Sequence, residues 1–231
     1  MSERIRTKML SLLYKNQSKA LEKMLPEIGP ELIGEALEVC FDYAHAECAQ
    51  LLLPLASAQD KSNLLDIAMV SEQAYEQDKL LALLLPDFNE KECERVAIRC
   101  CEYGWSDVFS QVVDRAPEHR RNSLKLDWAA TQGNLNEVRV FLDKCSGAER
   151  DRAMYLAAEC SRWETVKFLI PFCNARKVLE DFETEQYYQH GSYLNTIEQL
   201  KNMIETVECE QQRERLSVNI EVNALSSKRK L

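Results

Sequence analysis

The chain has 231 residues, of which 45% are hydrophobic and 29% charged, and its formal net charge is −9. This charge argues against general nucleic-acid binding, which needs a basic face, and suits a partner with a basic surface. No stretch approaches the roughly 18 apolar residues of a membrane span, and the N-terminus lacks the apolar segment of a secretory signal. Because glycine and proline are few (6 of each) and helix formers abundant, we expect helices.

A short pattern recurs six times along the chain, in which apolar residues are followed by a proline or an aspartate. The stops fall 28, 32, 28, 29 and 28 residues apart. A fixed period in this range is typical of a solenoid, in which each repeat is one supersecondary element stacked on the next. The six stretches are Met24-Leu25-Pro26, Leu52-Leu53-Pro54, Leu84-Leu85-Pro86, Val112-Val113-Asp114, Phe141-Leu142-Asp143 and Leu169-Ile170-Pro171.

Each repeat reads as two helices, most clearly over residues 126–142. Residues 126–133 predict a short first helix that ends at Gly133, because glycine accepts the left-handed conformation of a helix end. The second helix follows, with Asn134 or Asn136 as its N-cap. A small pair, Ala129-Ala130, lets neighbouring first helices approach closely, and other repeats carry Ala157-Ala158 or Cys100-Cys101 in its place.

This pattern of a small pair, a glycine turn and a leucine-rich second helix resembles ankyrin repeats, most specifically over residues 95–173. The resemblance implies an all-α, ankyrin-like helical-repeat solenoid of about six to seven helix hairpins. The period is shorter than the family's 33 residues, and the Thr-Pro-Leu-His tetrapeptide is absent. We therefore expect short connections in place of projecting β-hairpins. A tetratricopeptide array is the competing fold, with a period that lies farther away.

After Cys173 the strict pattern fades, and the sequence predicts helices over residues 174–190 and 192–216. The predicted organisation is a solenoid over residues 1–176, capping helices over 177–219 and a basic, disordered tail over 220–231. A capping hairpin is expected because the end of a solenoid needs a polar outer face. The second capping helix carries a one-sided apolar stripe formed by Leu194, Ile197, Leu200, Ile204 and Val207.

The sequence offers little that would support catalysis. Its nine cysteines lie mostly in apolar helical patterns and are expected to be reduced core thiols, which favours the cytoplasm. Cys40, His45 and Cys48 have the residue types of a zinc site, but a fourth ligand is missing. The histidines are too scattered for a catalytic triad in a solenoid. We expect no enzyme, no metal and no cofactor, although a cysteine-rich metal-dependent regulator or enzyme stays an alternative.

Polar or aromatic residues recur at the end of each first helix, just before the turn. Because the repeats share one geometry, these side chains should form a ladder along one surface, and the resemblance implies that this surface is the concave groove. Tyrosine is enriched among the residues that dominate binding energy. The candidate partner-binding residues are Asp42, Tyr43, Glu102, Tyr103, Thr131, Gln132 and Glu159.

These observations predict a non-catalytic protein–protein interaction scaffold that acts as an adaptor, an inhibitor or an effector. The expected partner is another protein, with no nucleic acid and no membrane span, and the chain itself is expected to be a monomer or a weak homo-oligomer. Degenerate, hairpin-poor ankyrin repeats resemble those of intracellular pathogens and viruses, which implies possible delivery into a host cell. A further alternative is a structural subunit that self-associates through the helix at residues 192–216.

Overall fold

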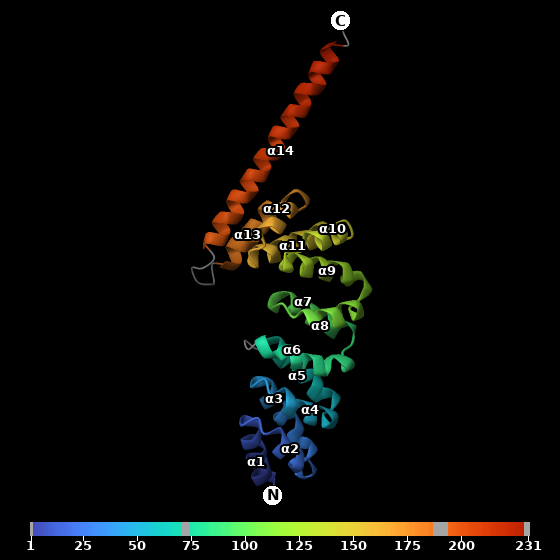
Figure 1. The fold of residues 1–231 in the computed structure, drawn as a ribbon, viewed down its shortest axis with the longest axis vertical. Helices are drawn as coiled ribbons and strands as arrows, with labels where there is room; N and C mark the ends of the chain where they lie inside the picture. Colours follow the sequence, from blue (N-terminus) through green and yellow to red (C-terminus); the bar gives the residue numbers. More distant parts are fainter. Residues whose placement is uncertain (1, 71–73, 187–193, 229–231) are drawn as a thin grey trace. The chain divides into compact units, whose positions relative to one another are not determined.

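The computed structural model describes residues 2–70, 74–186 and 194–228. In these ranges the chain forms fourteen α-helices joined by single-turn 3₁₀-helices and short connections, and none of the described residues is in a strand (Figure 1). The all-α prediction is confirmed. The chain divides into an N-terminal unit, residues 1–121, and a C-terminal unit, residues 122–231. Within the described residues, no helix is both long enough and apolar enough to cross a membrane.

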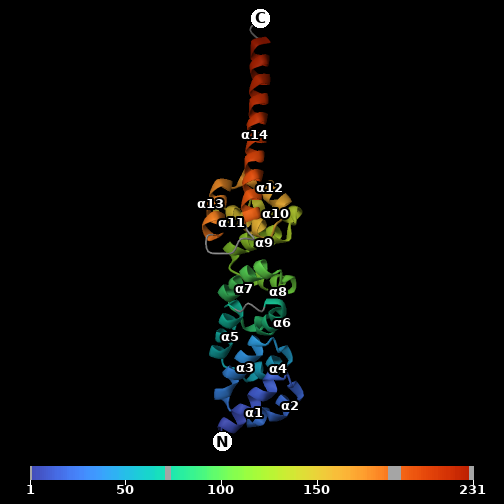
Figure 2. The same ribbon diagram turned by 90° about the vertical axis from the view of Figure 1, so that its left-hand side faces the viewer.

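The N-terminal unit consists of helix pairs whose members pack on their neighbours in chain order. The first helices α1, α3 and α5 contact one another in succession, and the second helices α2, α4, α6 and α8 do the same (Figures 1 and 2). The helices are α1 (Ser2–Tyr14), α2 (Ser18–Met24), α3 (Ile33–Asp42), α4 (Ala46–Leu52), α5 (Ala58–Val70), α6 (Ala74–Leu84), α7 (Glu90–Tyr103) and α8 (Ser106–Val112).

The C-terminal unit has one continuous apolar core. Val138, Met154, Val166, Phe182 and Leu200 are fully buried in it, each on a different helix. The unit boundary falls within the first turns of α9. The helices are α9 (Glu118–Gln132), α10 (Leu135–Leu142), α11 (Gly147–Glu159), α12 (Trp163–Leu169), α13 (Ala175–Gln186) and α14 (Leu194–Lys228).

The predicted stops are the C-terminal ends of the second helices. Five of them are single 3₁₀ turns, and in four of these a proline ends the α-helix, because proline has no N–H to donate and clashes with the preceding helical turn. The sixth, Asp143, is the C-cap of α10. The turns are Leu25–Glu27, Leu53–Leu55, Leu85–Asp87, Val113–Arg115 and Ile170–Phe172.

The connections from one helix pair to the next are short. Only two residues separate Arg115 from Glu118, at the start of α9, and Phe172 from Ala175, at the start of α13. Such connections have no room for a projecting hairpin, so the helices follow one another closely along the chain.

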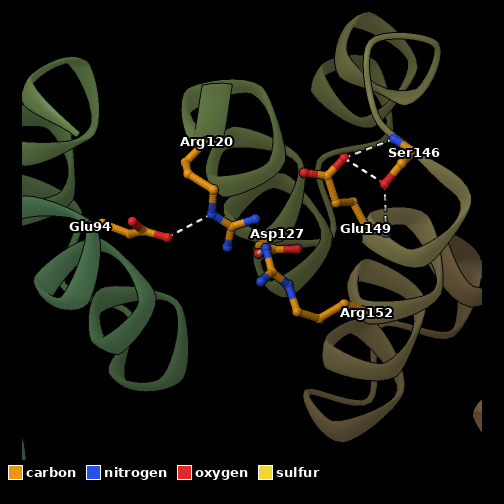
Figure 3. A network of polar contacts seen from close by, with 6 residues as sticks. All are labelled: Glu94, Arg120, Asp127, Ser146, Glu149 and Arg152. Atoms are coloured by element: carbon orange, nitrogen blue, oxygen red, sulfur yellow. Dashed lines mark hydrogen bonds and ion pairs between the residues drawn. The ribbon is translucent and has the colours of Figure 1, made fainter. Parts of the chain in front are cut away.

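Charged side chains join helix pairs that are neighbours in the sequence. In the N-terminal unit, Arg6 binds the Glu35 carboxylate with two nitrogens, and Arg120 Nε lies 2.6 Å from Glu94 Oε1 (Figure 3). The bidentate contact with Arg6 holds the pKa of Glu35 below its usual value. Two further pairs are Arg95–Asp66 and Lys61–Asp87.

In the C-terminal unit the corresponding pair has a buried acid and a partly exposed arginine. Arg152 of α11 binds Asp127 of α9, whose side chain is almost inaccessible to solvent (Figure 3). A buried carboxylate must be paired, because leaving it alone in a low-dielectric core costs several kcal/mol (about 3–5). The start of α11 is fixed separately, by a capping box in which Ser146 and Glu149 exchange hydrogen bonds (Figure 3).

The end of the chain differs from the prediction. Helix α14 runs from Leu194 to Lys228 and so includes residues 220–228, for which the sequence predicts a basic, disordered tail. The physical reason is that no glycine or proline occurs between Leu194 and Lys228 to end the helix. The apolar stripe predicted on this helix packs on α11, α12 and α13 through Leu200, Ile204 and Val207.

Candidate binding surface at the helix ends

The turn between the two helices of a repeat has the same backbone geometry five times. In each copy one residue takes a left-handed conformation, and the next residue's N–H bonds to the carbonyl five positions earlier, as in a Schellman motif. The acceptors Cys100, Ala129 and Ala157 are the first members of the small pairs recognised in the sequence, and Leu12 and Cys40 accept in the other two turns. The left-handed residues are Asn16, Ala44, Gly104, Gly133 and Ser161.

This turn fixes the direction of the residues just before it. Gly133 ends α9 as predicted, and Asn134 caps α10 by accepting a hydrogen bond from the Glu137 N–H at 3.4 Å. In the same turn Arg162 Nε donates to the Thr131 carbonyl at 2.8 Å, which links two successive repeats. The turn at Gly133 is therefore held by both backbone and side-chain hydrogen bonds.

Tyr43 is the centre of an exposed aromatic group on the N-terminal unit. Its side chain is 52% exposed, and that of Tyr14, one repeat earlier, is 54% exposed. The two rings meet edge to face at 5.3 Å, and the His45 ring stacks on Tyr43 at 5.9 Å. Asp42, next to Tyr43, is also exposed. We call these four residues the Tyr43 tier.

A second group of the same kind surrounds Tyr103, whose side chain is 36% exposed. The Trp105 ring stacks on Tyr103 at 5.1 Å, and the Arg99 guanidinium lies 4.4 Å from the centre of the Tyr103 ring. Arg99 Nη1 also binds the Glu102 carboxylate at 2.5 Å. We call Arg99, Glu102, Tyr103 and Trp105 the Tyr103 tier.

Of the candidate partner-binding residues in the C-terminal unit, two are exposed and one is buried. Gln132 and Glu159 are exposed at the ends of α9 and α11. Thr131 is only 2% exposed, and its hydroxyl donates to the Trp128 carbonyl at 2.9 Å. Its side chain therefore faces the interior, and it does not belong to the surface ladder on which the sequence placed it.

Sequence reasoning missed Tyr14 and His45 as members of this surface, and it missed Trp105, which is buried beside Tyr103 and supports its ring. The signal was present, because Tyr14 and Tyr43 stand one repeat apart at the same helix end. His45 and Trp105 likewise follow their tyrosines at the same distance. An alignment of the helix pairs on the turn residue, rather than on the proline stops, would have placed all three residues at matching positions.

The cysteines do not form a reactive group. Nine free thiols are present, and burial raises the pKa of Cys40 far above its usual value, that of Cys100 to about 12 and that of Cys145 to about 11. Among the residues that the structure describes, no three His, Cys, Asp or Glu side chains converge as metal ligands would. Cys48 instead donates to Asn16 Oδ1 at 3.5 Å.

One cavity of about 420 Å³ lies between α11 and α13, a volume that suits a small molecule. Two of its charged residues already have partners. Arg152 binds Asp127, and Asp151 accepts a hydrogen bond from the Asn174 N–H at 2.7 Å. The side chains of Arg152 and Asp151 therefore stabilise the fold through these contacts.

The chain was compared with protein-family models, with curated proteins and with solved structures, and none of the three comparisons found a match.

Proposed function

We propose that this protein is a non-catalytic binding scaffold, an ankyrin-like solenoid of helix hairpins that captures another protein on the surface formed by the ends of the first helices of its N-terminal unit. The observation that carries the proposal is the pair of exposed tyrosine tiers, built on the same turn and flanked by acids. The buried thiols suit a reducing compartment such as the cytoplasm.

The tiers have the composition and the rigidity that binding anchors need. Tyrosine contributes a large contact area while only a few rotatable bonds must be fixed, and it is common among the residues that dominate binding energy. The rings already contact one another, so little side-chain freedom remains to be lost on binding. The net charge of −9 and the acids beside both tyrosines favour a partner with a basic surface.

Affinity capture with a surface variant tests the proposal. In the variant, Tyr43 and Tyr103 become Ala, and Glu102 and Glu159 become Lys. Each of these side chains is exposed, so we expect the variant to fold. We expect partners recovered by the wild type, and identified by mass spectrometry, to be lost.

A matched control carries changes on second helices, Glu22→Lys in α2 and Gln50→Ala in α4, where both residues are exposed. It should retain the partners. If the folded tyrosine variant recovers the same partners at full yield, or if the control loses them equally, the surface at the ends of the first helices is not the binding site.

A second candidate function is self-association through α14. Leu200, Ile204 and Val207, in the first part of this helix, pack in the core, and its C-terminal part extends beyond the other helices of its unit (Figures 1 and 2). A single helix is marginally stable in water without a partner. Light scattering on a chain ending after Glu210, which keeps the Arg176–Glu208 ion pair, tests this role, and an unchanged mass would exclude it.

A further inference from the structure

The two tyrosine tiers are copies of one arrangement. An acid precedes a tyrosine at the end of a first helix, a left-handed residue follows, and the next residue stacks its ring on the tyrosine. The ring centres are 5.9 Å apart in the Tyr43 tier and 5.1 Å apart in the Tyr103 tier. The matched positions are Asp42 and Glu102, Tyr43 and Tyr103, Ala44 and Gly104, and His45 and Trp105.

The copies differ in one respect that concerns charge. In the Tyr103 tier, Arg99 lies over the tyrosine ring and forms an ion pair with Glu102. The position of Arg99 is taken by Val39 in the other copy, and Val39 is only 9% exposed. Helix α3 contains no Lys or Arg at all, so it cannot supply a cation from another position.

The Asp42 carboxylate of the Tyr43 tier can therefore accept hydrogen bonds from a bound cation. Among the residues that the structure describes, no hydrogen bond or ion pair engages the Asp42 side chain. Glu38, one turn earlier on α3, is exposed and adds negative charge, whereas Glu35 is neutralised by Arg6. Lys15, beside Tyr14, is the one cation next to a tier residue in the sequence.

We infer that the Tyr43 tier binds an arginine side chain of the partner protein, in the place that Arg99 fills within the Tyr103 tier. This inference rests on the proposed function and specifies the chemistry that one part of the surface recognises. The guanidinium would donate hydrogen bonds to the Asp42 carboxylate and lie against the rings of Tyr14 and Tyr43.

Arginine suits this site for two physical reasons. Its planar group stacks on aromatic rings and is more weakly hydrated than a lysine ammonium, and its donors match a carboxylate. The two exposed tyrosine rings meet at an interplanar angle of 89°, so their faces point in different directions and a flat cation can stack on the face of one of them. The Tyr103 tier shows both contacts made by one residue.

NMR titration of the full chain tests the inference with a defined probe, N-acetyl-arginine methylamide. Its neutral isostere, N-acetyl-citrulline methylamide, is the matched control. We expect the tyrosine ring signals of Tyr14 and Tyr43 to move with the arginine probe and to stay in place with the citrulline probe. The Asp42→Asn variant should respond about fivefold less, since an exposed ion pair contributes up to roughly that factor.

A second variant locates the effect. Glu102→Gln changes the tier that already holds its own arginine, so the response of Tyr43 should equal that of the wild type. Equal responses to both probes, no movement of the Tyr43 signal, or an unchanged response in folded Asp42→Asn would each overturn the inference. Any of these results leaves the capture experiment unaffected, because a partner can bind the surface without placing an arginine at this tier.

Discussion

The left-handed turn offers a stability test that depends on backbone conformation alone. Ala44 and Gly104 occupy the same turn position in the N-terminal unit, with φ angles of 54° and 74°. The left-handed conformation costs a residue with a Cβ roughly 1–2 kcal/mol in the folded state. Glycine avoids this cost, but its more flexible unfolded chain lowers the free energy of unfolding by about 0.4–1 kcal/mol. We therefore expect Ala44→Gly to stabilise this unit by about 0.5–1 kcal/mol, and Gly104→Ala to destabilise it by a similar amount.

The Gly104→Ala variant tests backbone conformation without a steric clash. A Cβ added at Gly104 meets no atom within 4 Å, so steric contact cannot account for a loss of stability. Urea unfolding followed by circular dichroism measures both variants. Gly147→Ala is the control, since Gly147 lies at the start of α11 without a positive φ, and a Cβ there also meets nothing within 4 Å. The reasoning is refuted if Gly104→Ala is neutral, or if Ala44→Gly lowers the free energy of unfolding.

Three further predictions follow from buried groups. Arg152→Met should destabilise the C-terminal unit by up to about 3 kcal/mol because it removes the guanidinium that binds the buried Asp127 carboxylate, whereas Arg176→Met, which breaks an exposed pair, should change the stability far less; thermal unfolding compares them. Thr165→Val should stabilise by about 1 kcal/mol, since the buried hydroxyl has no hydrogen-bond partner, and a lower melting temperature would contradict this. With iodoacetamide near pH 8, the exposed Cys209 should be alkylated first, while Cys100, whose pKa is raised to about 12, should react only on unfolding, as mass spectrometry of the labelled peptides would show.

The sequence predicted the elements that depend on local chemistry. Proline in the first turn after an apolar run ends a helix wherever it occurs, so Pro26, Pro54, Pro86 and Pro171 located four helix ends. Gly133 and Asn134 marked a turn and a cap by the same local logic. These residues act through the local backbone, so their effect does not depend on which side chains pack against them.

Other features depend on tertiary packing and could not be read in the same way. Thr131 and Gln132 are adjacent and both polar, yet Thr131 is buried and Gln132 is exposed. Successive residues of α9 point about 100° apart around the helix, and the sequence alone does not show which side of the helix faces the core. Tyr14 lies in the repeat that matches the pattern least. The aromatic contacts of Tyr43 become apparent only when the neighbouring repeat is in place.

In the N-terminal unit, the extensive helix contacts and the ion pairs join residues about one repeat apart in the chain. A newly made hairpin therefore has its docking site ready before the remainder of the polypeptide has left the ribosome. Construction of this unit can advance hairpin by hairpin during synthesis, without waiting for distant segments to arrive.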